Sequence, residues 1–133
     1  MSRSILVIED DPSLLRSVSR NLTARGYVTR GVMTVAEAIA AIHEEIPSLV
    51  IADIDLPDGS GWEVLRALRD AGHAEVKAIV MSALRPNPRL AEELGVAGTL
   101  EKPFPIDSLL RLVVSTAGNR QEQTSGPATE DWG

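Results

Sequence analysis

Short apolar segments alternate with amphipathic helical patterns along most of the chain. The apolar segments predict five strands, at residues 4–8, 27–29, 49–52, 76–81 and 97–101. Each of these segments is followed by apolar residues at the spacing of one helix face. Because strands and helices alternate, the pattern predicts an α/β fold in which a mostly parallel sheet has helices on both faces.

The predicted helices begin at capping signals. These signals are Asp11 with Pro12, Thr34 with Glu37, and Ser60 with Glu63. The helix that follows Thr34 is expected to bury Ile46 and to end at Pro47, because proline cannot continue a helix. Before the fifth strand, Pro86 and Pro88 leave room for about two helical turns. We therefore expect a shortened fourth helix.

Composition narrows the class of protein. The 133 residues include no cysteine, so disulfides and thiolate metal sites are excluded. No run approaches the roughly 18 apolar residues of a membrane span, and the first residues lack a secretory signal, so we expect a cytoplasmic protein. The net charge of −6 opposes direct binding to nucleic acid. We expect one domain at residues 1–118 and a polar, disordered tail at residues 119–133.

Polar side chains stand where the apolar strands end. The first strand runs into Glu9 and Asp10, the third into Asp53, the fourth into Ser82 and the fifth into Lys102. Ligands of open parallel sheets bind beyond the carboxyl ends of the strands. If these strands are neighbours, three acids, a hydroxyl and a lysine meet at one edge of the sheet.

The chemistry of such a cluster favours a metal ion. Two carboxylates about 4 Å apart repel by about 4 kcal/mol at an effective dielectric constant of about 20, so three acids need a cation. Oxygen ligands without cysteine favour Mg²⁺, Ca²⁺ or Mn²⁺ over zinc, and a site that also takes phosphate is typical of Mg²⁺. A carboxylate can act as a nucleophile toward phosphorus, and Asp53 is the best placed.

Four motifs, each at a strand end and in this order, resemble the response-regulator receiver family. They are ILVIEDDP at 5–12, VIADIDLPDGSG at 50–61, VMSA at 80–83 and LEKPF at 100–104. The resemblance covers about residues 3 to 117. It implies a flavodoxin-like, doubly wound, five-stranded parallel sheet of order 2-1-3-4-5.

The resemblance also implies a role for each site residue. Asp10 would bind Mg²⁺ directly, Glu9 would support it through water, and the backbone carbonyl of Asp55 would be a further ligand. Asp53 would be both metal ligand and phosphoacceptor. The residues expected to contact the phosphoryl group are Ser82 and Lys102, and those expected to shape the surrounding turns are Pro57, Gly61 and a cis Pro103.

For function, the resemblance implies a stand-alone receiver that takes a phosphoryl group from a sensor histidine kinase or a histidine phosphotransfer protein. It would lose the group slowly to water and signal through contacts with a downstream protein, without binding nucleic acid or membrane. Because the chain supplies only the acceptor and the Mg²⁺ site, we do not expect it to be an enzyme in its own right.

The chain departs from the family pattern at Thr99. The family usually has a tyrosine or phenylalanine three residues before the lysine, and this side chain moves inward when the Ser82-type hydroxyl engages the phosphoryl group. Threonine cannot fill an aromatic pocket, so the usual two-state coupling is in doubt. The segment from Ser82 to Lys102 is also about two residues short.

Three other functions remain open from the sequence. Asp53 and Asp55 also look like the Asp-x-Asp motif of haloacid dehalogenase-like phosphatases, although that motif belongs near the start of its fold. Thr99 and the short fourth helix would suit an interaction module that does not depend on phosphorylation. Flavin binding is disfavoured because no Ser/Thr/Gly-rich phosphate loop follows the first strand. We assign no role to His43 or His73.

Overall fold

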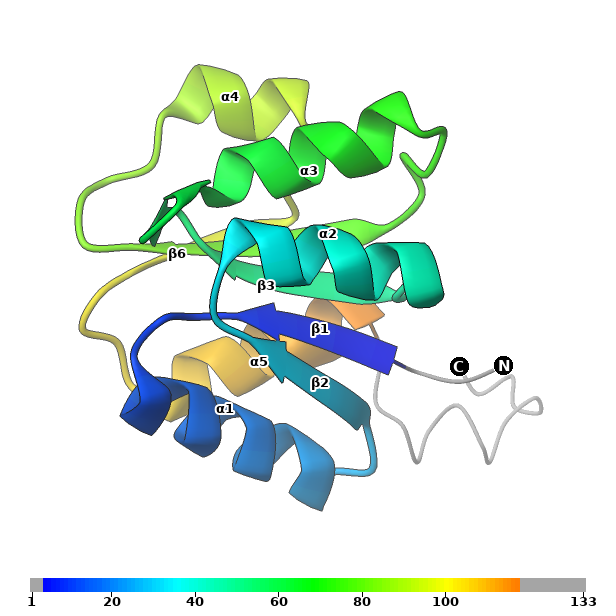
Figure 1. Cartoon of the computed structure of the whole chain (residues 1–133). Coiled ribbons are helices and arrows are strands. Elements are labelled where there is room, and N and C mark those ends of the chain that lie inside the picture. The colour runs from blue at the N-terminus through cyan, green and yellow to red at the C-terminus, as the bar shows by residue number, and fades with distance from the viewer. Residues whose placement is uncertain (1–3, 118–133) are drawn as a thin grey trace, which may run out of the picture.

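The apolar segments form a parallel sheet of five strands in a computed structural model that describes residues 4–117 (Figure 1). The order of the strands across the sheet is β2-β1-β3-β6-β7. Their bounds are β1 Ser4–Ile8, β2 Val28–Val32, β3 Leu49–Asp53, β6 Lys77–Ser82 and β7 Gly98–Glu101. This is the predicted order 2-1-3-4-5, with β6 and β7 as the fourth and fifth strands of the sheet, and the α/β prediction is confirmed.

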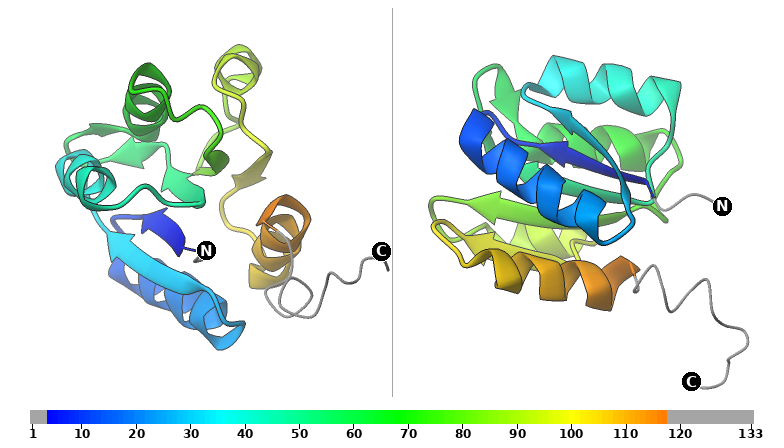
Figure 2. Two further views of the ribbon diagram at one scale, coloured as in Figure 1. Left: turned by 90° about the vertical axis from the view of Figure 1, so that its right-hand side faces the viewer. Right: turned by 90° about the horizontal axis from the view of Figure 1, so that it is seen from below.

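Helices cover both faces of the sheet (Figures 1 and 2). Their bounds are α1 Pro12–Ala24, α2 Val35–Glu44, α3 Gly61–Asp70, α4 Pro88–Glu93 and α5 Ile106–Ala117. α1 and α5 lie on one face, and α2, α3 and α4 lie on the other. In the described part of the chain, no helix combines the length and the apolar character needed to cross a membrane.

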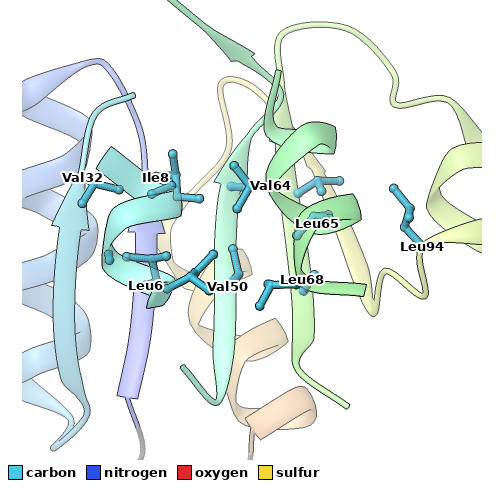
Figure 3. Packing of buried hydrophobic residues seen from close by; sticks show 14 residues of the cluster. Leu6, Ile8, Val32, Val50, Val64, Leu65, Leu68 and Leu94 are labelled. Atoms are coloured by element: carbon cyan, nitrogen blue, oxygen red, sulfur yellow. The ribbon is translucent and has the colours of Figure 1, made fainter. Parts of the chain in front are cut away.

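Successive residues of each central strand point to opposite faces of the sheet, so the chain has two apolar cores. On one face, Leu6 and Val50 pack with Leu68 and other residues of α2 and α3 (Figure 3). On the other face, Val7 and Ile51 pack with residues of α1 and α5. All five residues of β3 are buried, as expected for a central parallel strand.

The predicted N-caps are present. Asp11 accepts a hydrogen bond from the Ser13 amide, and Thr34 accepts one from the Glu37 amide, each at 3.0 Å. Ser60 also caps its helix, but it accepts from the Trp62 amide rather than from that of Glu63. These side chains satisfy amide groups that have no partner within a helix, and they fix where α1, α2 and α3 begin.

Two predictions about this part of the fold are wrong. α2 ends at Glu44 and the backbone of Glu45 is already extended, so Ile46 lies outside the helix with 38% of its surface exposed. The residue before Pro47 is disfavoured in helical conformation, which explains the early end. β2 begins and ends later than predicted and includes Arg30 and Gly31. As an edge strand it exposes these residues, so an apolar pattern could not reveal it.

The segment after β3, predicted as a loop, contains a small antiparallel hairpin. Its strands are β4 Asp55–Leu56 and β5 Gly59–Ser60. The shortened fourth helix is confirmed, since α4 has six residues and Asn87 as its N-cap. The predicted tail at 119–133 and the domain boundary at residue 118 lie outside the described residues.

Candidate functional site

Three carboxylates meet at the carboxyl end of the sheet. Glu9 and Asp10 follow β1 and Asp53 ends β3, and one oxygen of each lies within 4.8 Å of the others. We call these three residues the acidic cluster. Parallel pairing of β1 with β3 sets Ile8 opposite Ala52, so the following residues, Glu9 and Asp53, emerge side by side. Glu9 and Asp53 are buried, whereas Asp10 is exposed.

Lys102 contacts two members of the acidic cluster. Its Nζ lies 2.8 Å from Glu9 Oε1 and donates a hydrogen bond of 2.9 Å to Asp53 Oδ2. The lysine amide donates to the Ser82 carbonyl at 2.7 Å, which continues the pairing of β7 with β6. The peptide bond between Lys102 and Pro103 is cis, as predicted.

The charges of this site do not balance. Three carboxylates face one ammonium group, which Glu9 and Asp53 share, so negative charge is in excess at the site. Burial raises the pKa of Glu9, and the contacts of Glu9 with Lys102 and the Asp11 amide only partly oppose this. Burial acts to lower the pKa of Lys102, but its hydrogen bonds and charge interactions with Asp53 and Glu9 outweigh burial and raise it.

The donor set fits a divalent cation. Glu9 Oε1 is buried, and it shares the ammonium group of Lys102 with Asp53. Taking carboxylates out of water is costly unless cations offset their charge, and one lysine cannot offset three acids. All the donors are oxygen atoms, which Mg²⁺ prefers. The acidic cluster can therefore hold a Mg²⁺ ion, which would relieve the repulsion among the three carboxylates.

The other predicted site residues take different positions. The Asp55 amide donates to Asp53 Oδ1 at 3.1 Å, while the Asp55 side chain is exposed. Ser82 is buried, and its hydroxyl accepts from the Leu84 amide at 3.2 Å. Thr99 is exposed on β7, where it lines a surface hollow beside α5.

Of the predicted turn residues, Gly61 has the clearest structural reason. A Cβ atom at this position would lie 2.3 Å from the carbonyl oxygen of Asp53. The chain therefore passes directly over the backbone of Asp53, which only glycine allows. Pro57 and Pro103 are exposed.

We expect Asp10→Asn to weaken Mg²⁺ binding by about tenfold, a loss of about 1.4 kcal/mol. The change removes a negative charge and a strong oxygen ligand from the acidic cluster. Calorimetric titration of both proteins with Mg²⁺ measures the difference. Asp11→Asn is the matched control, because it makes the same change one residue away and asparagine is an equally good N-cap. Equal affinities of Asp10→Asn and the unaltered protein would contradict the ligand assignment.

A sheet of this order with an acidic cluster and a lysine at its carboxyl edge defines a class of signalling domain. The chain belongs to the response regulator receiver domains, whose family model matches residues 5–114. Such domains work in two-component systems, where they interact with histidine kinases or phosphotransfer proteins and use Mg²⁺ at an acidic pocket.

Individual relatives differ in length. The acid tolerance regulatory protein ActR of Rhizobium meliloti is 31% identical over 134 residues, covering 97% of this chain and 67% of ActR. The polar-differentiation response regulator DivK of Brucella ovis is 26% identical over 122 residues, covering 90% of this chain and 99% of DivK. Among solved structures, a CheY-like receiver domain protein from Methanospirillum hungatei has a TM-score of 0.81 and 25% identity, covering 92% of this chain and 99% of that one.

Proposed function

We propose that this chain is a Mg²⁺-dependent phosphoryl acceptor that receives its phosphoryl group on Asp53 from a histidine kinase or a histidine phosphotransfer protein. The observation that carries this proposal is the arrangement of Lys102, whose ammonium group contacts both Asp53 and Glu9 beside a third carboxylate. This arrangement supplies a carboxylate nucleophile together with positive charge for the oxygens of the incoming group.

The transfer needs no further protein group as nucleophile. A carboxylate oxygen of Asp53 forms a bond to phosphorus while the bond from phosphorus to the donor's imidazole nitrogen breaks, and the imidazole keeps that electron pair. Mg²⁺, held by Asp10, Asp53 and the Asp55 carbonyl and supported by Glu9 through water, would neutralise charge on the phosphoryl oxygens. Lys102 would pair with one of these oxygens and the Ser82 hydroxyl would donate to another.

The chain would act as an acceptor and not as an enzyme, because the bound group stays on Asp53 until water slowly removes it. We further propose a stand-alone cytoplasmic receiver that signals by phosphorylation-dependent contacts with a downstream protein. The similarity to DivK, which covers 99% of that protein, supports the stand-alone part of this proposal. The net charge of −6 supports a protein target over direct contact with nucleic acid.

The test is phosphorylation by a small donor. Incubation with acetyl phosphate and Mg²⁺ is expected to add one phosphoryl group that is stable in acid and labile in base, as measured by intact-mass spectrometry. Omitting Mg²⁺ or adding a chelator should suppress the adduct. If the folded protein gains no phosphoryl group under these conditions, the proposal is wrong. Steady release of phosphate from phosphomonoesters would instead favour a phosphatase.

A second candidate is an interaction module that works without phosphorylation, and the exposed Thr99 favours it. Without an aromatic side chain at this position, occupancy of Asp53 has no obvious means of altering β7 and α4. Hydrogen exchange of the protein with and without the phosphoryl group separates the two functions. Changed protection in α4, β7 and α5 supports the phosphorylation switch, and unchanged protection throughout supports the alternative.

A further inference from the structure

The turn of the β4–β5 hairpin is attached to the first turn of α2 by one side chain. Asp58 accepts a hydrogen bond from the Val35 amide at 2.8 Å with one oxygen and from the Ala36 amide at 3.0 Å with the other. These two bonds lower the pKa of Asp58 and so favour its charged form, and the bond from Val35 has the larger effect. Asp58 is thus a second cap of α2, supplied from 22 to 23 residues away.

The attached hairpin is continuous with the phosphoacceptor. Just before it, the Ile54 carbonyl accepts from the Gly61 amide at 2.9 Å and closes the hairpin at its base. At its first residue, the Asp55 amide donates to Asp53 Oδ1. A shift of the hairpin would therefore move the amide that orients the Asp53 carboxylate, together with the backbone of Asp55.

The segment that joins β2 to α2 is also bonded to Glu9. The Glu9 amide donates to the Val32 carbonyl at 3.0 Å, where β2 ends. Residues 32–36 are therefore bonded to the end of β1 on one side and, through Asp58, to the hairpin after β3 on the other (Figure 1). The acidic cluster draws its members from these two connected strand ends.

We propose that Asp58 is a positioning residue for the Mg²⁺ and phosphoryl site, because it fixes the hairpin that orients Asp53 and Asp55. The part of the proposal that concerns phosphoryl transfer rests on the function proposed above. In the described part of the chain, Asp58 lies outside the acidic cluster and its carboxylate accepts from two backbone amides, so it acts through the hairpin and not on the ligand.

Thr34→Ala provides a matched control for Asp58→Ala. Thr34 caps the same helix through the Glu37 amide but has no bond to the hairpin. Both variants leave α2 amides unsatisfied, so both are expected to lower the melting temperature by a few degrees. Only Asp58→Ala is expected to weaken Mg²⁺ binding, by about tenfold, as other residues that orient metal ligands do.

The experiment measures melting temperature, Mg²⁺ affinity by calorimetry, and the rate of phosphoryl uptake from acetyl phosphate at saturating donor. Weaker Mg²⁺ binding and slower uptake in Asp58→Ala, with both close to normal in Thr34→Ala and partly restored in Asp58→Asn, support the proposal. Normal Mg²⁺ affinity in Asp58→Ala, or equal losses in the two alanine variants, overturns it. If the unaltered protein binds Mg²⁺ but takes up no phosphoryl group, the proposed function fails, while the comparison of Mg²⁺ affinities still decides the role of Asp58.

Discussion

Replacing Asp53 with asparagine is expected to abolish phosphoryl uptake from acetyl phosphate completely. The amide has no negative charge and is a poor nucleophile toward phosphorus, so the acceptor is lost. Asparagine has nearly the same size as aspartate, but it has only one side-chain oxygen that can accept hydrogen bonds. Asp53 now accepts from the Asp55 amide and from Lys102, and asparagine can replace only one of these bonds. Intact-mass spectrometry after incubation with donor and Mg²⁺ measures the outcome.

Asp55→Asn is the control for this experiment. It removes the same charge two residues along the chain, but the Asp55 side chain is exposed and only its backbone is expected to serve the site. Uptake in Asp55→Asn should therefore reach the stoichiometry of the unaltered protein. An undiminished adduct in Asp53→Asn that is otherwise folded would show that the phosphoryl group is attached elsewhere, and the assignment of Asp53 would have to be abandoned.

The convergence of the site could be predicted because it depends on sheet topology. Carboxyl ends of parallel strands share one edge, so polar residues that directly follow apolar strands must lie near one another. Glu9 and Asp53 meet because β1 pairs with β3, and the Lys102 amide bonds to the end of β6. The N-caps could also be predicted, because the interaction is local: Asp11, Thr34 and Ser60 each accept from an amide two or three residues away.

The features that sequence reasoning missed depend on contacts between distant segments. Asp58 lies within the motif at 50–61, and nothing local indicates that its carboxylate reaches the start of α2. Ile46 has the spacing of a buried helix residue, but the helix stops before it. β2 is exposed along much of its length as an edge strand, so its polar residues carried no strand signal. In each case tertiary context decides the structure.

Gly61→Ala is expected to destabilise the protein by about 3 kcal/mol, a fall in melting temperature on the order of 10 °C. The new Cβ would lie 2.3 Å from the Asp53 carbonyl oxygen and 3.1 Å from its carbon. Both are backbone atoms of a fully buried strand, so no side-chain rotation can relieve the overlap. Either β3 or the start of α3 has to move. Because the displaced residue is Asp53, phosphoryl uptake should also slow in the fraction that remains folded.

Gly31→Ala separates this close backbone approach from the general effect of adding a methyl group. Neither glycine has a positive φ, so neither substitution strains the backbone conformation. Gly31 lies on the edge strand β2, and its added Cβ would meet the end of the Leu15 side chain at 2.9 Å. This side chain belongs to α1 and can rotate away. Thermal unfolding of the two variants should therefore show a small loss for Gly31→Ala and a large one for Gly61→Ala. Similar losses would mean that the segment above Asp53 yields easily, and that Gly61 does not fix the backbone of Asp53.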